Sequence, residues 1–429
     1  MTPSGKWSDF HIYELDSKIT LFVQPTGRFK NVVLRLFVRS HLGDDPSATA
    51  VLPHVLMRGT RKRPTMGKIS GHLDGMYGAR ADADAAKIGE NHVLSFRVDC
   101  VADRHLPGRT GNVKRAMEFL AEMATDPAGN GKGLRADYVE QEVRNQRRAL
   151  EDLMSDRGEW AAVRCVESMC RGEAYATNEM GTLEGLAKLT AASLTARHRR
   201  LLETAPIELY VAGRVEADEV AAMADRAFRI RKRGVVGEVP ATVVNVPTGE
   251  PRRVVEKMDV EQGKLVMGFR TGVTYADPES TALSFFNGVF GGFAHSRLFV
   301  NVREREGLAY SAGSSLEKTK GLMMVHAGID LKKFDKCLEV ILAELDSIRA
   351  GKVTDAEMEA TRRAMMERAR AVLDSPARAI AGLYERRLSG AAKTVEESLR
   401  EVADVTREDV VKVARRAKLD TVYFLTAKG

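Results

Sequence analysis

The sequence predicts an α+β fold made of two homologous halves, each a mostly antiparallel sheet with helices packed on one face. Two observations support this prediction. Strands and long helices alternate irregularly along the chain, which argues against the regular βαβ count of a parallel sheet. The chain also repeats itself, because the order of strand, polar turn and helix that begins at Leu36 returns from Gly268.

The repeat predicts where the first helix of each half begins. When the two stretches are aligned without gaps, Asp45-Pro46 falls on Asp277-Pro278. An aspartate can accept hydrogen bonds from the free amides of a helix N-terminus, and proline suits the first helical position. We therefore expect a helix to open at each Asp-Pro pair.

Later elements of the two halves also correspond. A long charged helix is expected over 140–156 in the first half and over 357–375 in the second. Each half then has an apolar strand, at 207–213 and at 421–427, and the first half adds a helix at 216–228. Agreement in the order of several elements favours a duplication over a chance match.

The border between the halves is predicted from composition. Residues 231–253 contain glycine, proline and β-branched residues but no helical period, which is typical of a linker. The sequence thus predicts an N-terminal domain over 1–230, a linker over 231–253 and a C-terminal domain over 254–429.

The composition is that of a folded protein, since 44% of the 429 residues are hydrophobic. The four cysteines form no C-x-x-C pair, which fits neither a zinc ribbon nor a disulfide framework and favours a reducing compartment. The N-terminus lacks the apolar core of an export signal, and no stretch has the roughly 18 uninterrupted apolar residues of a membrane helix. We therefore expect a cytoplasmic protein without a membrane partner.

The net charge of +7 is spread over separate basic clusters at 58–64, 197–200 and 229–233. A nucleic-acid surface would gather such residues on one face beside stacking aromatics, and aromatic residues make up only 6% of the chain. We therefore expect solvated surface charge and no nucleic-acid partner. A mild preference for acidic peptides is the alternative.

One stretch, Ala48–Thr60 (ATAVLPHVLMRGT), places a histidine in a helix-like pattern before a Gly-Thr pair. Together with Gly291–Ser315 (GGFAHSRLFVNVREREGLAYSAGSS) and 137–186, it resembles the insulinase/pitrilysin-type metallopeptidases, the inverted zincins with an H-x-x-E-H motif. The resemblance covers nearly the whole chain and is strongest to small bacterial members with two homologous halves. Residues 137–186 resemble the subgroup associated with elongation factor P modification, in which one member of a neighbouring gene pair lacks the zinc motif.

The zinc motif of the family is degenerate in this chain. Anchored on Gly59-Thr60, the family's first histidine, glutamate, second histidine and distal glutamate fall on Ala50, Pro53, His54 and Ala149, in that order. Glu151 is the alternative for the last position. The resemblance thus implies a peptidase-like domain in each half, of which the first has lost its zinc motif.

These replacements predict that the chain holds no zinc or other cofactor of its own. Catalytic zinc takes three protein ligands and an open position for water, and Ala50 offers no lone pair. Pro53 would lie inside the helix, where proline removes a backbone hydrogen bond at a cost of roughly 3 kcal/mol and favours a kink. His54 is then either a partly buried structural residue or part of a shared metal site.

The second half retains the residues of a different family element. In the family, an arginine and a tyrosine of the C-terminal half help to hold the substrate and stabilise the oxyanion of peptide hydrolysis, and the resemblance places them at Arg303 and Tyr310. A permanently charged guanidinium and a phenol that donates a hydrogen bond suit that role. The spacing fits a helix that ends at Arg303, a turn at Glu306-Gly307 and a strand from Leu308. In the alternative, Tyr310 packs and Arg303 pairs with a neighbouring glutamate.

The resemblance therefore implies the non-zinc subunit of a heterodimeric zinc peptidase that cleaves peptides or small unfolded proteins. A homologous partner subunit would bring zinc and the complete motif, and Arg303 and Tyr310 would complete its active site in trans. A peptide would add a strand to a sheet edge, for which Arg80–Val98 contains the candidate strand. The alternative is a non-catalytic scaffold or assembly subunit. An autonomous hydrolase has little support, because no Ser-His-Asp, Cys-His or phosphate-loop pattern has a recognisable spacing.

Overall fold

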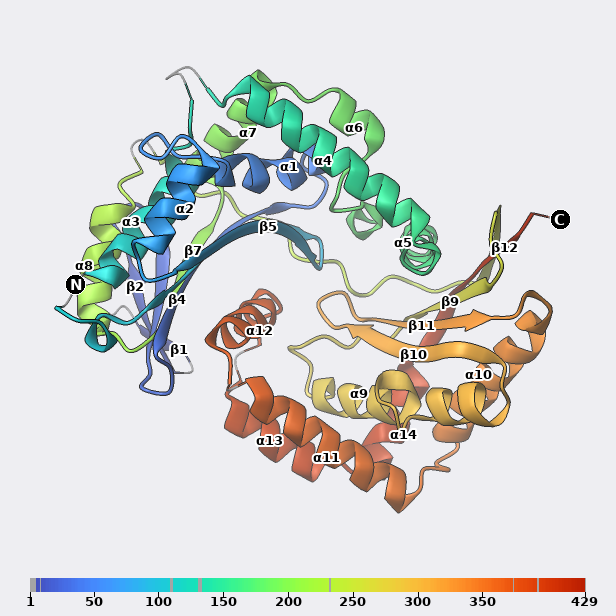
Figure 1. Cartoon of the computed structure of the whole chain (residues 1–429). Coiled ribbons are helices and arrows are strands. Elements are labelled where there is room, and N and C mark those ends of the chain that lie inside the picture. The colour runs from blue at the N-terminus through green and yellow to red at the C-terminus, as the bar shows by residue number, and fades with distance from the viewer. Residues whose placement is uncertain are drawn as a thin grey trace. The chain divides into compact units, whose positions relative to one another are not determined.

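Two compact units make up the chain (Figure 1). Unit 1 contains Met1–Leu150, Thr177–Ala241 and Ser375–Gly382, and unit 2 contains Glu151–Ala176, Thr242–Asp374 and Leu383–Gly429. The structure is a computed structural model that describes residues 5–7, 9–108, 111–129, 133–230, 233–372, 374–391 and 393–428. Residues 231 and 232, which open the predicted linker, lie outside these ranges, and 233–251 form neither helix nor strand.

Unit 1 is built on a sheet that has seven strands in the described residues, in the order β1-β2-β3-β7-β4-β6-β5. Neighbouring strands are antiparallel except β3 and β7, which run parallel. The strands are β1 (Gly5–Trp7), β2 (Phe10–Glu14), β3 (Thr20–Pro25), β4 (Asn31–His41), β5 (Arg80–Ile88), β6 (Asn91–Val101) and β7 (Ile207–Gly213). The candidate peptide-binding strand of the sequence is thus β5, which lies at a sheet edge.

Helices cover this sheet: α1 contacts β5 and β6, α3 contacts β4 and β6, and α8 contacts β3 (Figure 1). The helical segments are α1 (Pro46–Met57), α2 (Met66–Asp74), η1 (Asp103–His105), α3 (Asn112–Thr125), α4 (Ala136–Ser155), α6 (Leu183–Ala187), α7 (Ala191–Thr204) and α8 (Ala217–Ala227). Of these, α4 passes from unit 1 into unit 2 at Leu150.

Unit 2 is built on a sheet that has five strands among the described residues, in the order β10-β11-β9-β12-β8. Only β12 and β8 pair in parallel within it. The strands are β8 (Arg252–Met258), β9 (Gly263–Arg270), β10 (Ala309–Glu317), β11 (Leu322–Ile329) and β12 (Lys418–Ala427). The α+β prediction of two mostly antiparallel sheets is confirmed.

The helical segments of unit 2 include two of π-helical geometry, η3 and η4. Among the described residues these segments are α5 (Arg157–Met169), η2 (Ala174–Ala176), α9 (Ser280–Asn287), η3 (Gly288–Gly292), η4 (Leu298–Arg305), η5 (Leu331–Lys333), α10 (Phe334–Arg349), α11 (Asp355–Val372), α13 (Val395–Asp404) and α14 (Arg407–Arg416). A further helix, α12 (Pro376–Leu388), begins in unit 1 and ends in unit 2.

Both faces of the second sheet are covered by helices. Leu265 and Met267 of β9 join the main core of unit 2, to which α9, α10 and α14 contribute. Val266, which lies between them and points to the other face, packs with Ala161 and Cys165 of α5. The sequence prediction placed helices on one face, so α5 is an addition that comes from the first half of the chain.

Buried charges fix this addition in place. Arg270 of β9 donates to Glu173 at 2.5 Å, just beyond α5, and to Asp420 of β12 at 2.8 Å. Glu173 also pairs with the fully buried Lys320 at 2.7 Å. Through these contacts, residues 151–176 pack within unit 2, although the predicted N-terminal domain, 1–230, includes them.

The predicted start of the first repeated helix is confirmed. α1 begins at Pro46, and the Asp45 side chain accepts a hydrogen bond from the Ala48 amide at 3.2 Å. The later elements are also confirmed, as helices α4, α8 and α11 and strands β7 and β12. Among the described residues, no helix is both long and apolar enough to cross a bilayer.

The predicted start of the second repeated helix is wrong. α9 begins at Ser280 rather than at Pro278. Asp277 instead accepts hydrogen bonds from the amide and the hydroxyl of Thr274, both at 2.7 Å. The aspartate therefore closes the preceding turn, which is the other common use of this residue type.

Candidate functional site

The degenerate motif lies on α1, which is packed as a core helix. Ala50 is 4% exposed, and Pro53 is buried within a helix that continues to Met57. A buried methyl group thus lies at Ala50, the predicted position of the family's first histidine, and this position contributes to packing.

His54 is the motif residue that keeps a donor atom. Its side chain is 38% exposed, and its Nε2 lies 3.9 Å from Oδ1 of Asp84 on the edge strand β5. The Asp84 side chain is well exposed, so this long contact contributes little to stability. His54 therefore lies half-exposed beside the sheet edge.

The predicted distal position, Ala149, is half-buried on α4. Instead, Glu142 links α4 to the end of α1. Its almost fully buried carboxylate forms an ion pair with Arg58, the residue that follows α1. Asn145 donates to the same carboxylate at 3.1 Å. Sequence reasoning missed this link, for which the i, i+3 spacing of Glu142 and Asn145 was the available signal.

The residues present do not fit a zinc ion. His54 and Asp84 together supply at most two ligands, whereas a catalytic zinc takes three from the protein. Within the described part of the chain, no group of three or more His, Cys, Asp and Glu side chains is arranged to hold a metal ion.

Arg303 lies on the π-helical segment η4, and its side chain is 42% exposed. Its guanidinium carbon lies 4.6 Å from the centroid of the Phe299 ring, and its Nε lies 3.4 Å from a carboxylate oxygen of Glu304. The contact with Glu304 is the pairing that the alternative interpretation of the sequence expected. A cation–π contact and an exposed ion pair of this kind are each weak.

Tyr310 lies in a β-bulge on the edge strand β10. The pairing of β10 with β11 shifts between Ala309 and Ser311, so Tyr310 is the extra residue, and it is 64% exposed. A bulge redirects a side chain relative to the strand. The predicted turn is present, and its Gly307 has a positive φ of 55°, but η4 ends at Arg305 rather than Arg303 and β10 begins at Ala309 rather than Leu308.

The π-helical geometry of η3 and η4 was missed in the sequence. The available signal was the glycine content of η3, Gly288–Gly292. A Cβ atom on Gly291 would lie 2.6 Å from the backbone nitrogen of Ser314 in β10, so this glycine permits close approach of the segment to the strand. π-helical segments are rare and recur at functional sites.

Comparisons with known proteins agree with this geometry. The family model "Peptidase M16 inactive domain" matches residues 188–365. The chain is 32% identical to the "probable inactive metalloprotease YmfF" of Bacillus subtilis (strain 168), over 97% of this chain and 98% of that protein. The crystal structure of a conserved protein from Enterococcus faecalis V583 superposes with a TM-score of 0.91 at 28% identity, over 98% of this chain and 99% of that one.

A more distant structure shares the fold. The peptidase M16 inactive domain from Pseudomonas fluorescens superposes with a TM-score of 0.81 at 16% identity, over 98% of this chain and 99% of that one. The match to the Bacillus protein extends over nearly the full length of both chains, and the sequence contains no H-x-x-E-H motif. The chain therefore belongs to the M16 family of insulinase/pitrilysin-type metallopeptidases, as a homologue that lacks the H-x-x-E-H motif.

Proposed function

We propose that this chain is the non-zinc subunit of a cytoplasmic heterodimeric zinc peptidase that hydrolyses peptides or small unfolded proteins. The partner is a homologous subunit with a complete H-x-x-E-H motif, which brings the zinc. Arg303 and Tyr310 of this chain complete the partner's active site.

The exposure of this pair carries the proposal. Tyr310 is 64% exposed in its bulge, and Arg303 is half-exposed on the neighbouring segment. Side chains that stabilise charge on a substrate must reach it from a surface. The packed helix α1 offers a single half-exposed donor, His54, so this chain has substrate-binding groups on one unit and lacks a metal site on the other.

The chemistry of the pair suits a carbonyl oxygen that gains negative charge. The guanidinium of Arg303 is charged at every physiological pH, and the phenol of Tyr310 donates one hydrogen bond. Removing one such donor typically lowers kcat by about 100- to 1000-fold.

The edge strand β5 supports a peptide substrate. Its outer side has no neighbouring strand among the described residues, and extended peptides bind such edges through main-chain hydrogen bonds. His54 and Asp84 lie beside this edge. We propose that an unfolded segment of the substrate pairs with β5 in the assembled enzyme.

The test is co-expression of the full chain with a homologous subunit of the same organism that carries H-x-x-E-H. We expect the two to co-purify, zinc to be present at one ion per pair, and fluorescein-labelled casein to be cleaved by the pair but not by this chain alone. Stoichiometric zinc together with casein cleavage by the lone chain would contradict the proposal.

Variants of this chain test donation in trans. Arg303→Ala and Tyr310→Phe should each lower kcat of the pair by about 100-fold. Two matched controls should retain activity: Arg363→Ala, an exposed arginine of unit 2 on α11, and Tyr77→Phe, a tyrosine of unit 1 that is 48% exposed. Full activity in both test variants would remove Arg303 and Tyr310 from the mechanism.

A scaffold function is the second candidate, because the contacts of Arg303 with Phe299 and Glu304 are also compatible with a local structural role. In that case, deleting the chain should disturb an assembly, as seen by a shift in its native mass, without removing a peptidase activity. Retained casein cleavage in a lysate that lacks the chain would favour the scaffold.

A further inference from the structure

We propose that Arg297 is a positioning residue whose buried guanidinium fixes η4 against α10 and α11 and thereby sets the direction of Arg303. The effect on catalysis rests on the proposed function, whereas the effect on η4 rests on contacts within unit 2. The two parts can therefore be tested separately.

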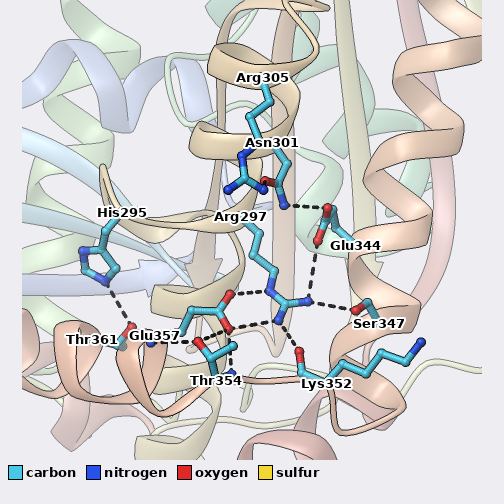
Figure 2. Close-up of polar contacts among 10 residues, drawn as sticks. All are labelled: His295, Arg297, Asn301, Arg305, Glu344, Ser347, Lys352, Thr354, Glu357 and Thr361. Atoms are coloured by element: carbon cyan, nitrogen blue, oxygen red, sulfur yellow. Dashed lines mark hydrogen bonds and ion pairs between the residues drawn. The ribbon is translucent and has the colours of Figure 1, made fainter.

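Arg297 immediately precedes η4, is 8% exposed and uses its whole guanidinium (Figure 2). Nε and Nη2 donate to the two carboxylate oxygens of Glu357 on α11, at 2.7 and 3.1 Å. Nη1 donates to the Ser347 hydroxyl of α10 at 3.1 Å and lies 3.5 Å from a Glu344 oxygen. Nη2 also donates to the carbonyl of Lys352, in the loop between the two helices.

A second link ties the middle of η4 to the same helix. Asn301 donates to Glu344 at 2.6 Å, and Arg305 donates to the side-chain oxygen of Asn301 at 3.2 Å (Figure 2). Glu344 thus receives groups from both Arg297 and Asn301. Arg303 lies between Asn301 and Arg305, so the network holds the backbone on both sides of it.

The main acceptor is itself held in place. Glu357 accepts hydrogen bonds from the amide and hydroxyl of Thr354 at 2.8 and 2.9 Å, and its own amide donates to that hydroxyl at 3.2 Å. This reciprocal arrangement is a capping box at the start of α11. Burial raises the pKa of Glu357, but the hydrogen bonds from Arg297 and Thr354 outweigh it and hold the pKa below its ordinary value.

The hydrogen bonds of Arg297 are better explained by the positioning of η4 than by a gain in stability. A buried ion pair loses so much hydration that well-packed apolar residues are often equally stable, whereas a planar five-donor group fixes direction. η4 has π-helical geometry, which is rare and often occurs at functional sites. Apart from Leu298 and Val302, the residues of η4 are at most partly buried, so apolar packing alone anchors it weakly.

The first experiment measures hydrogen–deuterium exchange of the full chain by mass spectrometry. In Arg297→Met, peptides that cover 298–305 should exchange about tenfold faster, because local opening becomes easier, while peptides of β9 and β12 should be unchanged. Glu357→Gln, which keeps the shape and removes the charge, should show the same local effect more weakly. Arg297→Lys should fall between wild type and Arg297→Met, because an ammonium cannot bond both oxygens with one planar face.

Arg270→Met is the matched control, because Arg270 is equally buried and holds Glu173 and Asp420 in the same unit. Its exchange should rise around 169–175 and not in η4. Unchanged exchange over 298–305 in both Arg297→Met and Glu357→Gln would overturn the inference, whatever the activity of the variants.

The second experiment measures casein cleavage by the assembled pair. Arg297→Met should lower kcat by about tenfold or more with KM within a factor of two, since a displaced donor is lost mainly in the transition state. Combined with Arg303→Ala, it should add little further loss. If Arg297→Met lowers kcat by the same factor in the Arg303→Ala background, Arg297 does not act through Arg303. If Arg303→Ala alone keeps full activity, the proposed function is overturned, and the exchange experiment decides the structural part.

Discussion

α1 in unit 1 and η4 in unit 2 carry residues that the family resemblance singles out, and the two segments are held in opposite ways. Most residues of α1 are buried, and they are mainly apolar or small. η4 buries Leu298 and Val302, exposes Arg303, and is anchored by the polar contacts of Arg297 and Asn301. One segment is held by core packing and the other by directed hydrogen bonds.

The difference lies in what the residues at the predicted positions contribute to the fold. On α1, the small or apolar residues Ala50 and Pro53 are buried and add to the core. The anchoring of η4 buries a charge that needs several partners, yet the segment presents a half-exposed arginine. A buried and fully paired charge such as that of Arg297 adds little to stability compared with well-packed apolar residues.

The sharpest test of this comparison introduces a histidine at position 50 of α1. Ala50→His should lower the free energy of unfolding by about 3 kcal/mol, because the larger ring overfills a buried site and its nitrogens lack partners there. Urea unfolding followed by circular dichroism, with EDTA present, measures the effect. Ala192→His, at an exposed position of α7, is the control and should change stability by less than about 1 kcal/mol. If Ala50→His lowers the free energy of unfolding by less than about 1 kcal/mol, α1 has room for a histidine at this position.

A second test uses pH, because a neutral histidine lies buried near α1. His92 of β6 is 0% exposed and pairs across the sheet with Ser40. The Ser40 hydroxyl accepts from Arg197, which also donates to Thr49 of α1 at 2.9 Å. Burial, with a contribution from the charge of Arg197, lowers the pKa of His92 to about 4.

The sign of the pH effect follows from this shift. Between pH 6.5 and 4 the unfolded chain binds a proton at His92 that the folded chain refuses, so stability is complete above pH 6.5 and falls as the pH drops. The loss should reach about 3 kcal/mol near pH 4. His92→Met should remove this part of the pH dependence in urea unfolding at pH 7, 5.5 and 4.5, and the exposed control His105→Met should not. An equal slope in wild type and His92→Met would refute the assignment.

The same pH series separates the two regions. Because the pKa of Glu357 is held below its ordinary value, the network at η4 contributes fully above the unfolded carboxylate pKa of 4.5 and is lost as the pH falls through the lower folded value. Peptides of 298–305 should therefore keep their slow exchange at pH 5.5. As the pH falls, the loss of stability that is due to His92, near α1, should begin before the loss that is due to Glu357.

Sequence patterns predicted the elements well where local chemistry decides. The strands at 207–213 and 421–427 are apolar runs whose position in a sheet core requires no long-range information. The start of α1 was predictable because Asp45 and Pro46 act within one turn. The same pair at Asp277 failed, because Thr274 competes for the carboxylate, and a local pattern does not show which partner prevails.

Long-range contacts decided what the sequence could not predict. The placement of 151–176 in unit 2 depends on Arg270 and Lys320, which follow in the second half of the chain. The roles of Arg297 and Glu357 likewise require that η4 and α11 meet in the fold. Arg303 and Tyr310 stood out through the family resemblance, but their exposure depends on a π-helical segment and a bulge that no residue pattern specified.

The smallest expected effect is the loss of stability when the exposed pair is removed. Arg303→Ala should cost less than about 1 kcal/mol, because its exposed ion pair and cation–π contact are both weak. Tyr310→Phe should cost at most about 0.5 kcal/mol, since the hydroxyl is lost from a largely exposed side chain. Urea unfolding of the lone chain measures both. A nearly unchanged stability combined with a large loss of kcat in the assembled pair is expected of side chains that act on a substrate, whereas a loss of several kcal/mol would make them structural and favour the scaffold.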